Sequence, residues 1–543
     1  MKGTALSPRY LLLAIALPSA AAASTPFDVW QPRALWDAWE NARFVEVEAP
    51  CVTPSVLTEE VERLRTTYPE QVRVRLLGES VEGRAIRLLR LGTGSRRVLL
   101  WSQMHGDEAS ATPALLDLAH ALLSSSSEAS RQILSELELL MVPMLNPDGA
   151  ERWTRRNAYD VDLNRDALHL ATPEARLLKE LRDETEPILG FNLHDQGRRI
   201  LAGETGELAT LSLLGVAGDP EGTLTPERER AMRAASAMVD AARWRLGEAI
   251  GRYDEDWNPR AFGDNITRWG TPVVLLESGG IRPERPISEL TRLNFIVLAH
   301  SLAALARNDL GDYSVDAYRA LPRNKRNGFS DLVVRGGDLW HPGSATRFRG
   351  DLAIDIVRAD HDAEECVERI AGRSRTRRSS VVEVGDGSQR VSGRDFDATD
   401  QVVFGALTVR WEGSKDQNSV DRSLRALAQL GVGSVLWQVP EDEAAKALEI
   451  ARELQRPGLP RLSVTAEEVE RGLRWTGSSP EGRTLGGLAN AFGVSMDDLL
   501  AETSAFRRGV PGSFFTVRSP GSEAPGADAP IEAVFLDGTS VDP

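Results

Sequence analysis

Short apolar runs alternate with helix-like spacing between positions 55 and 307. The strand-like runs are predicted at 72–77, 85–91, 96–101, 137–142, 188–193 and 273–276. Apolar residues at helical spacing predict helices at 55–66, 110–123, 173–185, 226–250 and 288–307, with Thr58 as the N-cap of the first. Strands that alternate with helices in this way indicate an α/β domain around a central, largely parallel sheet.

The pattern changes near residue 309. Residues 309–328 carry Gly, Pro, Arg and Asn without apolar periodicity, so we predict a linker there. Before it, the catalytic-type α/β domain is expected at 51–308, preceded by an irregular lead-in at 24–50. After it we expect a smaller α+β accessory domain at 329–507, to which we assign no chemistry. A flexible tail rich in Gly, Pro and Ser is expected at 508–543.

The N-terminus has the order of a secretory signal. Lys2 and Arg9 precede the apolar run 10–17, and small residues follow at 19–24. This order predicts a signal peptide at 1–23 and export to a periplasm or the exterior. The alternative is a disordered leader on a cytosolic protein. The run is too short for a good membrane span, and no later segment reaches about 18 uninterrupted apolar residues.

Composition narrows the choice of partners. The 543 residues carry a net charge of -16, which argues against a nucleic-acid partner. Apolar residues make up 41% and charged residues 27%, which is ordinary for a soluble globular protein. The two cysteines, Cys51 and Cys366, could pair in an oxidising compartment. They form no CxxC pair, so a thiolate zinc site is excluded.

Three residues offer the ligands of a metal ion. His105 and Glu108 stand three apart on the turn that follows the apolar run 98–101. His194 ends another predicted core strand, where α/β sheets place their ligands. A catalytic zinc takes imidazole and carboxylate ligands from three protein residues and leaves a fourth position open. Taken alone, the HxxE pair and His194 would each more often be structural, and the combination favours the metal.

A general base and a charged loop complete the candidate site. Glu277 follows the apolar run 273–276, where burying a carboxylate is costly unless it is paired or functional. We expect it to act as the general base, and the alternative is a structural salt bridge to Arg282. In the loop, Asp162 could accept the second N–H of a metal-bound histidine. Two arginines of the loop could stabilise an oxyanion or bind a carboxylate, although a simple turn cluster would have a similar composition.

Taken together, the motifs resemble the zinc metallocarboxypeptidase family of carboxypeptidase A, in a bacterial-type form. Their order is GESVEGR (78–84), HGDE (105–108), NPDG (146–149), RxN (155–157), DLNR (162–165), then a later His and a later Glu, within residues 50–308. The resemblance implies a three-layer α/β/α sandwich around a mixed eight-stranded sheet and one catalytic Zn²⁺.

The resemblance also implies residue roles. His105, Glu108 and His194 match the zinc ligands, and Glu277 matches the catalytic glutamate. Arg155 matches the arginine that polarises the scissile carbonyl, whereas Asn164 and Arg165 match the clamp for the terminal carboxylate of a peptide-like substrate. Tyr253 is the candidate for the tyrosine that closes over substrate. The segment 255–268, with Phe262 and Asp264, is expected to line the specificity pocket.

Some positions depart from the family pattern. Asp166 follows Arg165 where many relatives have Asn, and Asp195 and Gln196 follow His194. The expected reaction is hydrolysis of C-terminal peptide bonds. Peptidoglycan stem peptides are an alternative substrate, a binding protein that has lost catalysis is an alternative function, and deacylation of N-acyl amino acids is a lesser one.

Overall fold

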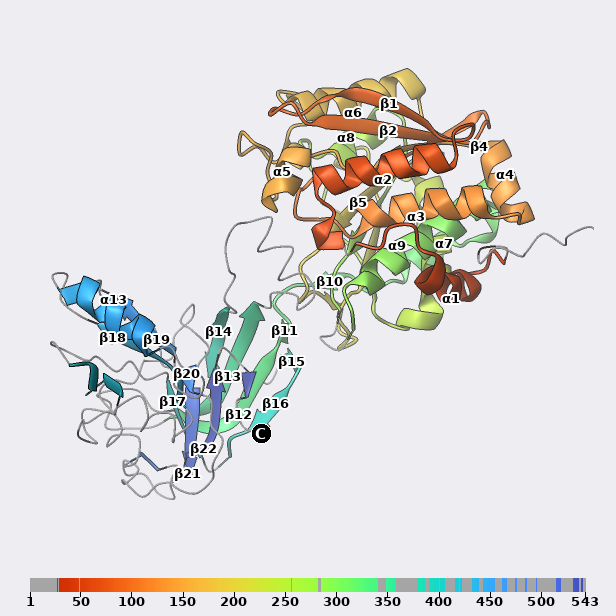
Figure 1. The fold of residues 1–543 in the computed structure, drawn as a ribbon. Coiled ribbons are helices and arrows are strands. Elements are labelled where there is room, and N and C mark those ends of the chain that lie inside the picture. Colours follow the sequence, from red (N-terminus) through yellow and green to blue (C-terminus); the bar gives the residue numbers. More distant parts are fainter. Residues whose placement is uncertain are drawn as a thin grey trace, which may run out of the picture.

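Eight strands form one mixed sheet in the first part of the chain, and the computed structural model places helices on both of its faces (Figure 1). The strand order is β1–β2–β4–β3–β5–β9–β7–β8. The strands are β1 (Arg73–Glu79), β2 (Ala85–Leu91), β3 (Arg96–Ser102), β4 (Leu137–Val142), β5 (Leu189–Asp195), β7 (Leu211–Gly215), β8 (Ile250–Arg252) and β9 (Val273–Ser278). The structure describes residues 27–339 except 28, 48, 255 and 282–284, and separate shorter stretches between 348 and 540.

The centre of this sheet is parallel and its flanks are not. Strands β4, β3, β5 and β9 run parallel to one another, whereas β1 and β2 are antiparallel and β7 is antiparallel to β9. The apolar pattern alone predicted a largely parallel sheet, while the family resemblance implied the mixed sheet that is present. Parallel central strands bring their carboxyl ends to the same edge, which is where ligands bind in such sheets.

Two layers of helices cover the sheet. The helices are α1 (Pro32–Ala42), α2 (Pro54–Thr67), α3 (Ala111–Ser124), α4 (Glu128–Glu136), α5 (Pro147–Arg152), α6 (Pro173–Thr185), α7 (Pro226–Leu246), α8 (Phe262–Arg268) and α9 (Ser288–Arg307). On one face, Val98 and Leu100 of β3 pack into the core built with α2, α3, α4, α7 and α9. On the other face, Leu99 and Trp101 pack with α6 and α8. Successive side chains of β3 therefore point into two different hydrophobic cores, one on each face of the sheet. The three-layer α/β/α sandwich is present.

The beginning of the chain differs from the sequence prediction in two ways. Residues 32–42, within the stretch expected to be irregular, form α1 and contact α9. Helix α2 begins at Pro54, and the side chain of Thr53 caps it by accepting a hydrogen bond from the Val56 N–H. The prediction of Thr58 as the N-cap is wrong, because Pro at the first helical position fixes the start one turn earlier. The hydroxyl of Thr58 instead donates to Pro54 O.

The long helix predicted at 226–250 ends earlier. Helix α7 stops at Leu246, and Gly247 follows with a φ of +55°, a backbone angle that favours glycine. The chain then enters β8 at Ile250. Because β8 pairs with β7, this early stop adds the last strand of the sheet and brings residue 253 toward the site.

The stretch at 309–328 is packed against the α/β domain. It contains a short 3-10 turn (Leu310–Asp312), α10 (Val315–Arg319) and β10 (Asn324–Lys325). Tyr318 is fully buried, and its hydroxyl accepts a hydrogen bond from Gly215 N of β7. This segment therefore belongs physically to the first domain up to β10, although the sequence pattern there is not periodic. The domain boundaries themselves stay predictions.

A second sheet follows in the described stretches of the C-terminal part. β12 (Leu332–Leu339) pairs with β13 (Phe348–Val357), which pairs in turn with β14 (Arg378–Gly385). The far side of the sheet contains β17 (Gln401–Gly405), β21 (Phe514–Arg518) and β22 (Ile531–Leu536). The predicted signal peptide at 1–23 lies outside the described residues. Among the residues described, no helix is long and apolar enough to cross a membrane.

Candidate metal centre and its surroundings

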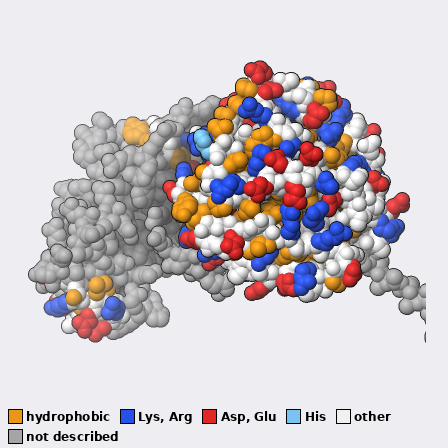
Figure 2. All heavy atoms as spheres, turned by 90° about the horizontal axis from the view of Figure 1, so that it is seen from above, with side chains coloured by type: hydrophobic (Ala, Val, Ile, Leu, Met, Phe, Trp, Pro, Cys, Tyr) orange, Lys and Arg blue, Asp and Glu red, His pale blue; other side chains and the backbone are white. Residues whose placement is uncertain are grey.

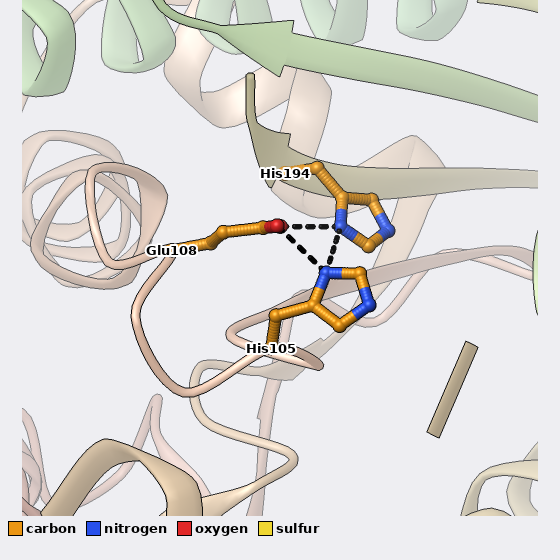
Figure 3. Close-up of side chains that lie close together, drawn as sticks. All are labelled: His105, Glu108 and His194. Carbon is orange, nitrogen blue, oxygen red and sulfur yellow. Dashed lines mark hydrogen bonds and ion pairs between the residues drawn. The ribbon is translucent and has the colours of Figure 1, made fainter. Parts of the chain in front are cut away.

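The three predicted metal ligands meet at the carboxyl edge of the central strands (Figure 3). His105 and Glu108 lie on the loop that leaves β3, and His194 is the second-last residue of β5. β3 and β5 are paired parallel neighbours, so their ends bring the two loops together. His105 and His194 are almost fully buried, and the ligand atoms of the three residues all lie within 4.8 Å of one another.

The distances fit one small cation. The two histidine Nδ1 atoms are 3.2 Å apart, and the Glu108 carboxylate lies 2.8 Å from His105 Nδ1 and 2.6 Å from His194 Nδ1. Ligand atoms that each lie about 2.1 Å from a tetrahedral zinc are roughly 3.4 Å from one another. Two nitrogens and a carboxylate already converge at close to that spacing, and two imidazole lone pairs would repel each other without a proton or a cation between them.

A second ring of side chains orients the cluster. His105 Nε2 lies 3.1 Å from Asp162 Oδ1, so the carboxylate accepts the ring N–H on the side away from Glu108. Arg155 donates to both acids, to Asp162 Oδ2 at 3.1 Å and to Glu108 Oε1 at 3.0 Å. The predicted second-sphere role of Asp162 therefore has the required contact, since such a carboxylate fixes the tautomer and the angle of a metal-bound histidine.

Burial and neighbouring charges shift the pKa values of the three cluster residues. Burial would raise the pKa of Glu108, but His194 and His105 outweigh it and hold that pKa below its ordinary value. Burial would likewise lower the pKa of His105, but Asp162 and Glu108 outweigh it and raise that pKa. Burial lowers the pKa of His194, which favours the neutral ring that a metal requires.

Glu277 stands beside the cluster on the next strand. β9 pairs with β5 in a register that sets Glu277 opposite His194. The carboxylate is buried, and burial together with the charges of Glu108 and Asp195 raises its pKa well above the ordinary value. A carboxylate with a raised pKa near a metal-bound water is the type of group that serves as a general base near neutral pH. Arg282, the alternative salt-bridge partner of Glu277, lies outside the described residues.

The remaining predicted residues are Tyr253 and residues of two connected segments, the turn at 163–165 and α8. Tyr253 is packed in the core with α6 and α8, and burial followed by the charge of Glu277 raises its pKa to about 12. Asn164 and Arg165 lie in the short 3-10 turn Leu163–Arg165. Asn164 Oδ1 accepts the Phe262 N–H at 2.8 Å, which ties this turn to the start of α8. Asp264, in the same helix, is buried, and its pKa is raised by that burial to about 6.

A family comparison matches this part of the chain. Residues 57–252 match the model described as zinc carboxypeptidase. This part of the chain is similar to the zinc carboxypeptidase family. The matched range includes all three cluster residues together with Arg155, Asp162, Asn164 and Arg165, whereas Tyr253 and Glu277 lie beyond it.

Two carboxypeptidases match this chain over short segments. Carboxypeptidase 2 of Trichophyton rubrum is 32% identical over 103 residues, which are 19% of this chain and 19% of the relative. Carboxypeptidase D of Drosophila melanogaster is 33% identical over 124 residues, which are 19% of this chain and 9% of the relative. The chain thus spans about a fifth or less of these relatives' lengths. A metallo-carboxypeptidase structure from Burkholderia cenocepacia is similar with a TM-score of 0.39 and 19% identity, covering 47% of this chain and 69% of that one.

Zinc dependence is a property of the family, and the chain supplies a matching donor set. The structure brings two imidazoles and one carboxylate together at one point, in line with catalytic zinc sites that use three protein ligands. The donor atoms are nitrogen and oxygen, their spacing suits zinc, and the carboxylate Asp162 supports His105 from behind.

The sequence analysis did not identify the residues next to His194 that fix its strand end by hydrogen bonds. Asp195, next to His194, accepts hydrogen bonds from the backbone N–H and the hydroxyl of Ser110 at the start of α3. Gln196 bonds to Ala209 O and Ser212 Oγ, each at 2.8 Å. The two residues stood out in the sequence only as departures from the family pattern, and their partners could not be identified without the fold.

Proposed function

We propose that the protein is a zinc-dependent carboxypeptidase that removes the last residue of a peptide. The proposal rests on one observation above all, the convergence of His105, Glu108 and His194 with the buried Glu277 on the neighbouring strand. A bound zinc ion would act as a Lewis acid and would lower the pKa of a coordinated water toward neutrality.

The chain's own residues then divide the remaining work. Glu277 takes the proton of the attacking water and delivers it to the leaving amine, because its carboxylate is buried beside the cluster and has a raised pKa. Arg155 keeps a guanidinium between Glu108 and Asp162, and its charge stabilises the oxyanion that develops on the scissile carbonyl.

Substrate orientation is assigned to the turn at 163–165. The guanidinium of Arg165 and the amide of Asn164 hold the free terminal carboxylate, which restricts cleavage to the last peptide bond. In the structure the turn is fixed by Asn164 Oδ1 on Phe262 N and by Arg260 Nε on Arg165 O, so both side chains start from a rigid backbone. Tyr253 closes the space over Glu277.

We also propose that the protein works outside the cytoplasm. The N-terminal order of charge, apolar run and small residues supports export. Cys51 is disulfide-bonded, which is typical of proteins from oxidising compartments. The other cysteine, Cys366, lies outside the described residues.

Zinc-loaded protein should be assayed on matched peptides with a free or an amidated C-terminus. We expect release of the last residue from the free peptides and at least a hundredfold slower release from the amidated ones, because amidation removes the charge that Arg165 binds. Peptidoglycan stem peptides with a free carboxylate form a second arm that identifies the substrate pool. Equal rates on free and amidated peptides would contradict an exopeptidase.

A further inference from the structure

The segment 322–326 returns to the candidate site after the α/β domain has ended. Arg252 N donates to Pro322 O at 2.7 Å, and Arg252 forms an isolated bridge with Arg323. β10 (Asn324–Lys325) then pairs antiparallel with β6 (Leu201–Ala202). Figure 1 shows β10 at the junction between the first domain and the second sheet. The segment thus runs beside the residue before Tyr253 and beside the loop that follows His194.

Asn324 inserts its amide into the polar network beneath the site. Its Nδ2 donates to Gln196 Oε1 at 2.8 Å, and its Oδ1 accepts from Ser212 Oγ at 2.9 Å. Gln196 lies two residues after His194, and Ser212 stands opposite Glu277 in the pairing of β7 with β9. The amide therefore contacts the supports of both a metal ligand and the proposed base.

The close approach needs glycines on the neighbouring strands. A Cβ at Gly251 would lie 2.2 Å from Asn324 Oδ1, and a Cβ at Gly279 would lie 2.4 Å from Gln196 Cγ. Neither distance is compatible with a side chain larger than hydrogen. The segment is thus seated in a space that the α/β domain leaves open for it.

The chain beyond β10 is also held in place. Leu201 and Leu208 form a small apolar cluster with Phe329 of β11 (Phe329–Ser330) and Val391 of β15 (Val391–Ser392), two strands that pair with each other. Arg199 binds the Asp331 carboxylate through Nη2 at 2.7 Å and Nε at 2.9 Å. Residues 326 and 327 form a turn between these two anchors, so the position of Arg326 is restricted from both sides.

Arg326 is an exposed cation two residues after Asn324, on the segment that the polar network anchors beside the site. Among the residues that the structure describes, its guanidinium has no ion pair and no hydrogen bond. Its positive charge nevertheless acts on both Glu277 and Tyr253. The other arginine that acts on these two residues is Arg155, which already binds Glu108 and Asp162.

The charge balance of the site gives Arg326 a role. Glu108, Asp195 and Glu277 would repel an acidic substrate, and the Arg165 side chain is assigned to the terminal carboxylate. Resting on the proposed function, we propose that Arg326 is a substrate-binding residue that holds a second carboxylate of the substrate, at a place separate from the Asn164–Arg165 clamp. The second carboxylate belongs to an acidic side chain, either of the last residue or of the one before it.

Four acetylated dipeptides separate these sources, namely acetyl-Ala-Glu and acetyl-Ala-Gln for the last residue, and acetyl-Glu-Ala and acetyl-Gln-Ala for the one before it. For the wild type we expect kcat/KM to be higher for the Glu peptide than for the Gln peptide in one of the two pairs. Arg326→Gln should lower that ratio about tenfold, mainly through KM, because a charge-assisted hydrogen bond is lost.

Two control variants accompany the assay. Arg326→Lys should keep most of the preference, because it keeps the charge. Arg319→Gln, at an exposed arginine of α10, removes the same charge elsewhere and should leave the ratio unchanged. Thermal unfolding of all variants checks that the fold is retained, which the exposure of both arginines favours.

Calorimetric binding of the four peptides to each protein separates the two proposals. If no peptide is hydrolysed, the proposed function fails, and the binding constants still test Arg326. Loss of the preference for Glu in Arg326→Gln supports the proposal, and the pair in which it is lost identifies the source of the carboxylate. A wild type without preference for Glu in either pair, or a preference equally strong in Arg326→Gln, would overturn it.

Discussion

Two carboxylates on neighbouring segments, Glu108 before α3 and Asp117 within it, are both shielded from water and are held in opposite ways. Glu108 contacts His105, His194 and Arg155, all of which carry or can carry positive charge. Asp117 accepts three neutral donors, Trp39 Nε1 at 2.8 Å, Phe44 N at 2.8 Å and Val45 N at 2.9 Å. Hydrogen bonds satisfy both groups, and only Glu108 has hydrogen-bond partners that are or can become cations.

The pKa values follow that difference. Burial raises the pKa of Asp117 to about 7, because its hydrogen bonds to neutral donors only partly oppose the loss of water. Glu108 shows the reverse, with a lowered pKa. A carboxylate surrounded by cationic partners stays ionised and can bind a metal, whereas Asp117 is an anchor that ties residues 39–45 to α3. The comparison indicates that the charge of the partners, rather than the number of hydrogen bonds, distinguishes a candidate metal ligand from a structural carboxylate.

The face of the first domain seen in Figure 2 carries no charged patch that would indicate a function. On the face of the first domain seen in Figure 2, acidic and basic side chains are interspersed without a large patch of one sign. The net charge of -16 is therefore not concentrated in one acidic region of that face.

The largest effect is expected at Glu277, a third buried carboxylate, whose nearest charges include Glu108 and Asp195. Glu277→Gln keeps the shape and removes the base, so kcat should fall on the order of 10³-fold or more. Zinc content should stay at the wild-type level, since Glu277 is not among the ligands. The control Glu248→Gln changes an exposed glutamate of the same domain. A Glu277→Gln protein with near-normal turnover would remove Glu277 from the mechanism.

Asp117 should make stability depend on pH in a way that Asp117→Asn does not. Its pKa is about 7 in the folded chain against an ordinary 3.8, so between these values the folded state holds a proton that the unfolded state has released. The stabilisation is complete below about pH 4 and is lost as the pH rises through about 7. The stability of the wild type relative to Asp117→Asn should therefore fall by up to on the order of 4 kcal/mol across that window.

Denaturant unfolding at several pH values measures this difference, and Asp37→Asn, at an exposed aspartate of α1, is the control. Turnover of Asp117→Asn at a pH where it remains folded should match the wild type, because the anchor is separate from the cluster. Parallel stability curves for wild type and Asp117→Asn would show that the proton is not bound there.

A smaller effect is expected at Asp162, which supports His105 without belonging to the cluster. Asp162→Asn keeps an acceptor oxygen and loses the charge, so zinc affinity should fall about 10- to 100-fold. Competition with a chelator of known affinity measures it. Asp160→Asn, two residues earlier and exposed, is the matched control. An unchanged affinity in Asp162→Asn would mean that the 3.1 Å contact with His105 does not tune the metal.

The sequence predicts the strands and the metal cluster well because both depend on restricted residue types. Buried strands need continuous apolar runs, and a zinc ligand must be one of few side chains, so His105, Glu108 and His194 stand out at strand ends. The site around Glu277 follows, since β9 was visible as an apolar run.

The supports of the site were not predictable in the same way. Asn324 and Gln196 are polar residues that many loops contain, and their meaning comes from a contact between segments 128 positions apart. Arg326 belongs to no motif, and Thr58 was chosen as a cap because a hydroxyl there is common, although Pro54 decides the helix start. Non-local contacts and competition between adjacent caps therefore set the limit of the sequence analysis.

The most direct test of the account is the zinc content of the purified chain. After dialysis against metal-free buffer and reloading with excess zinc followed by gel filtration, elemental analysis should find one zinc per wild-type chain. His194→Ala and Glu108→Ala should each retain close to none while keeping the wild-type circular dichroism spectrum. One zinc per chain in both variants, or none in the wild type, would contradict the central claim that His105, Glu108 and His194 hold the ion.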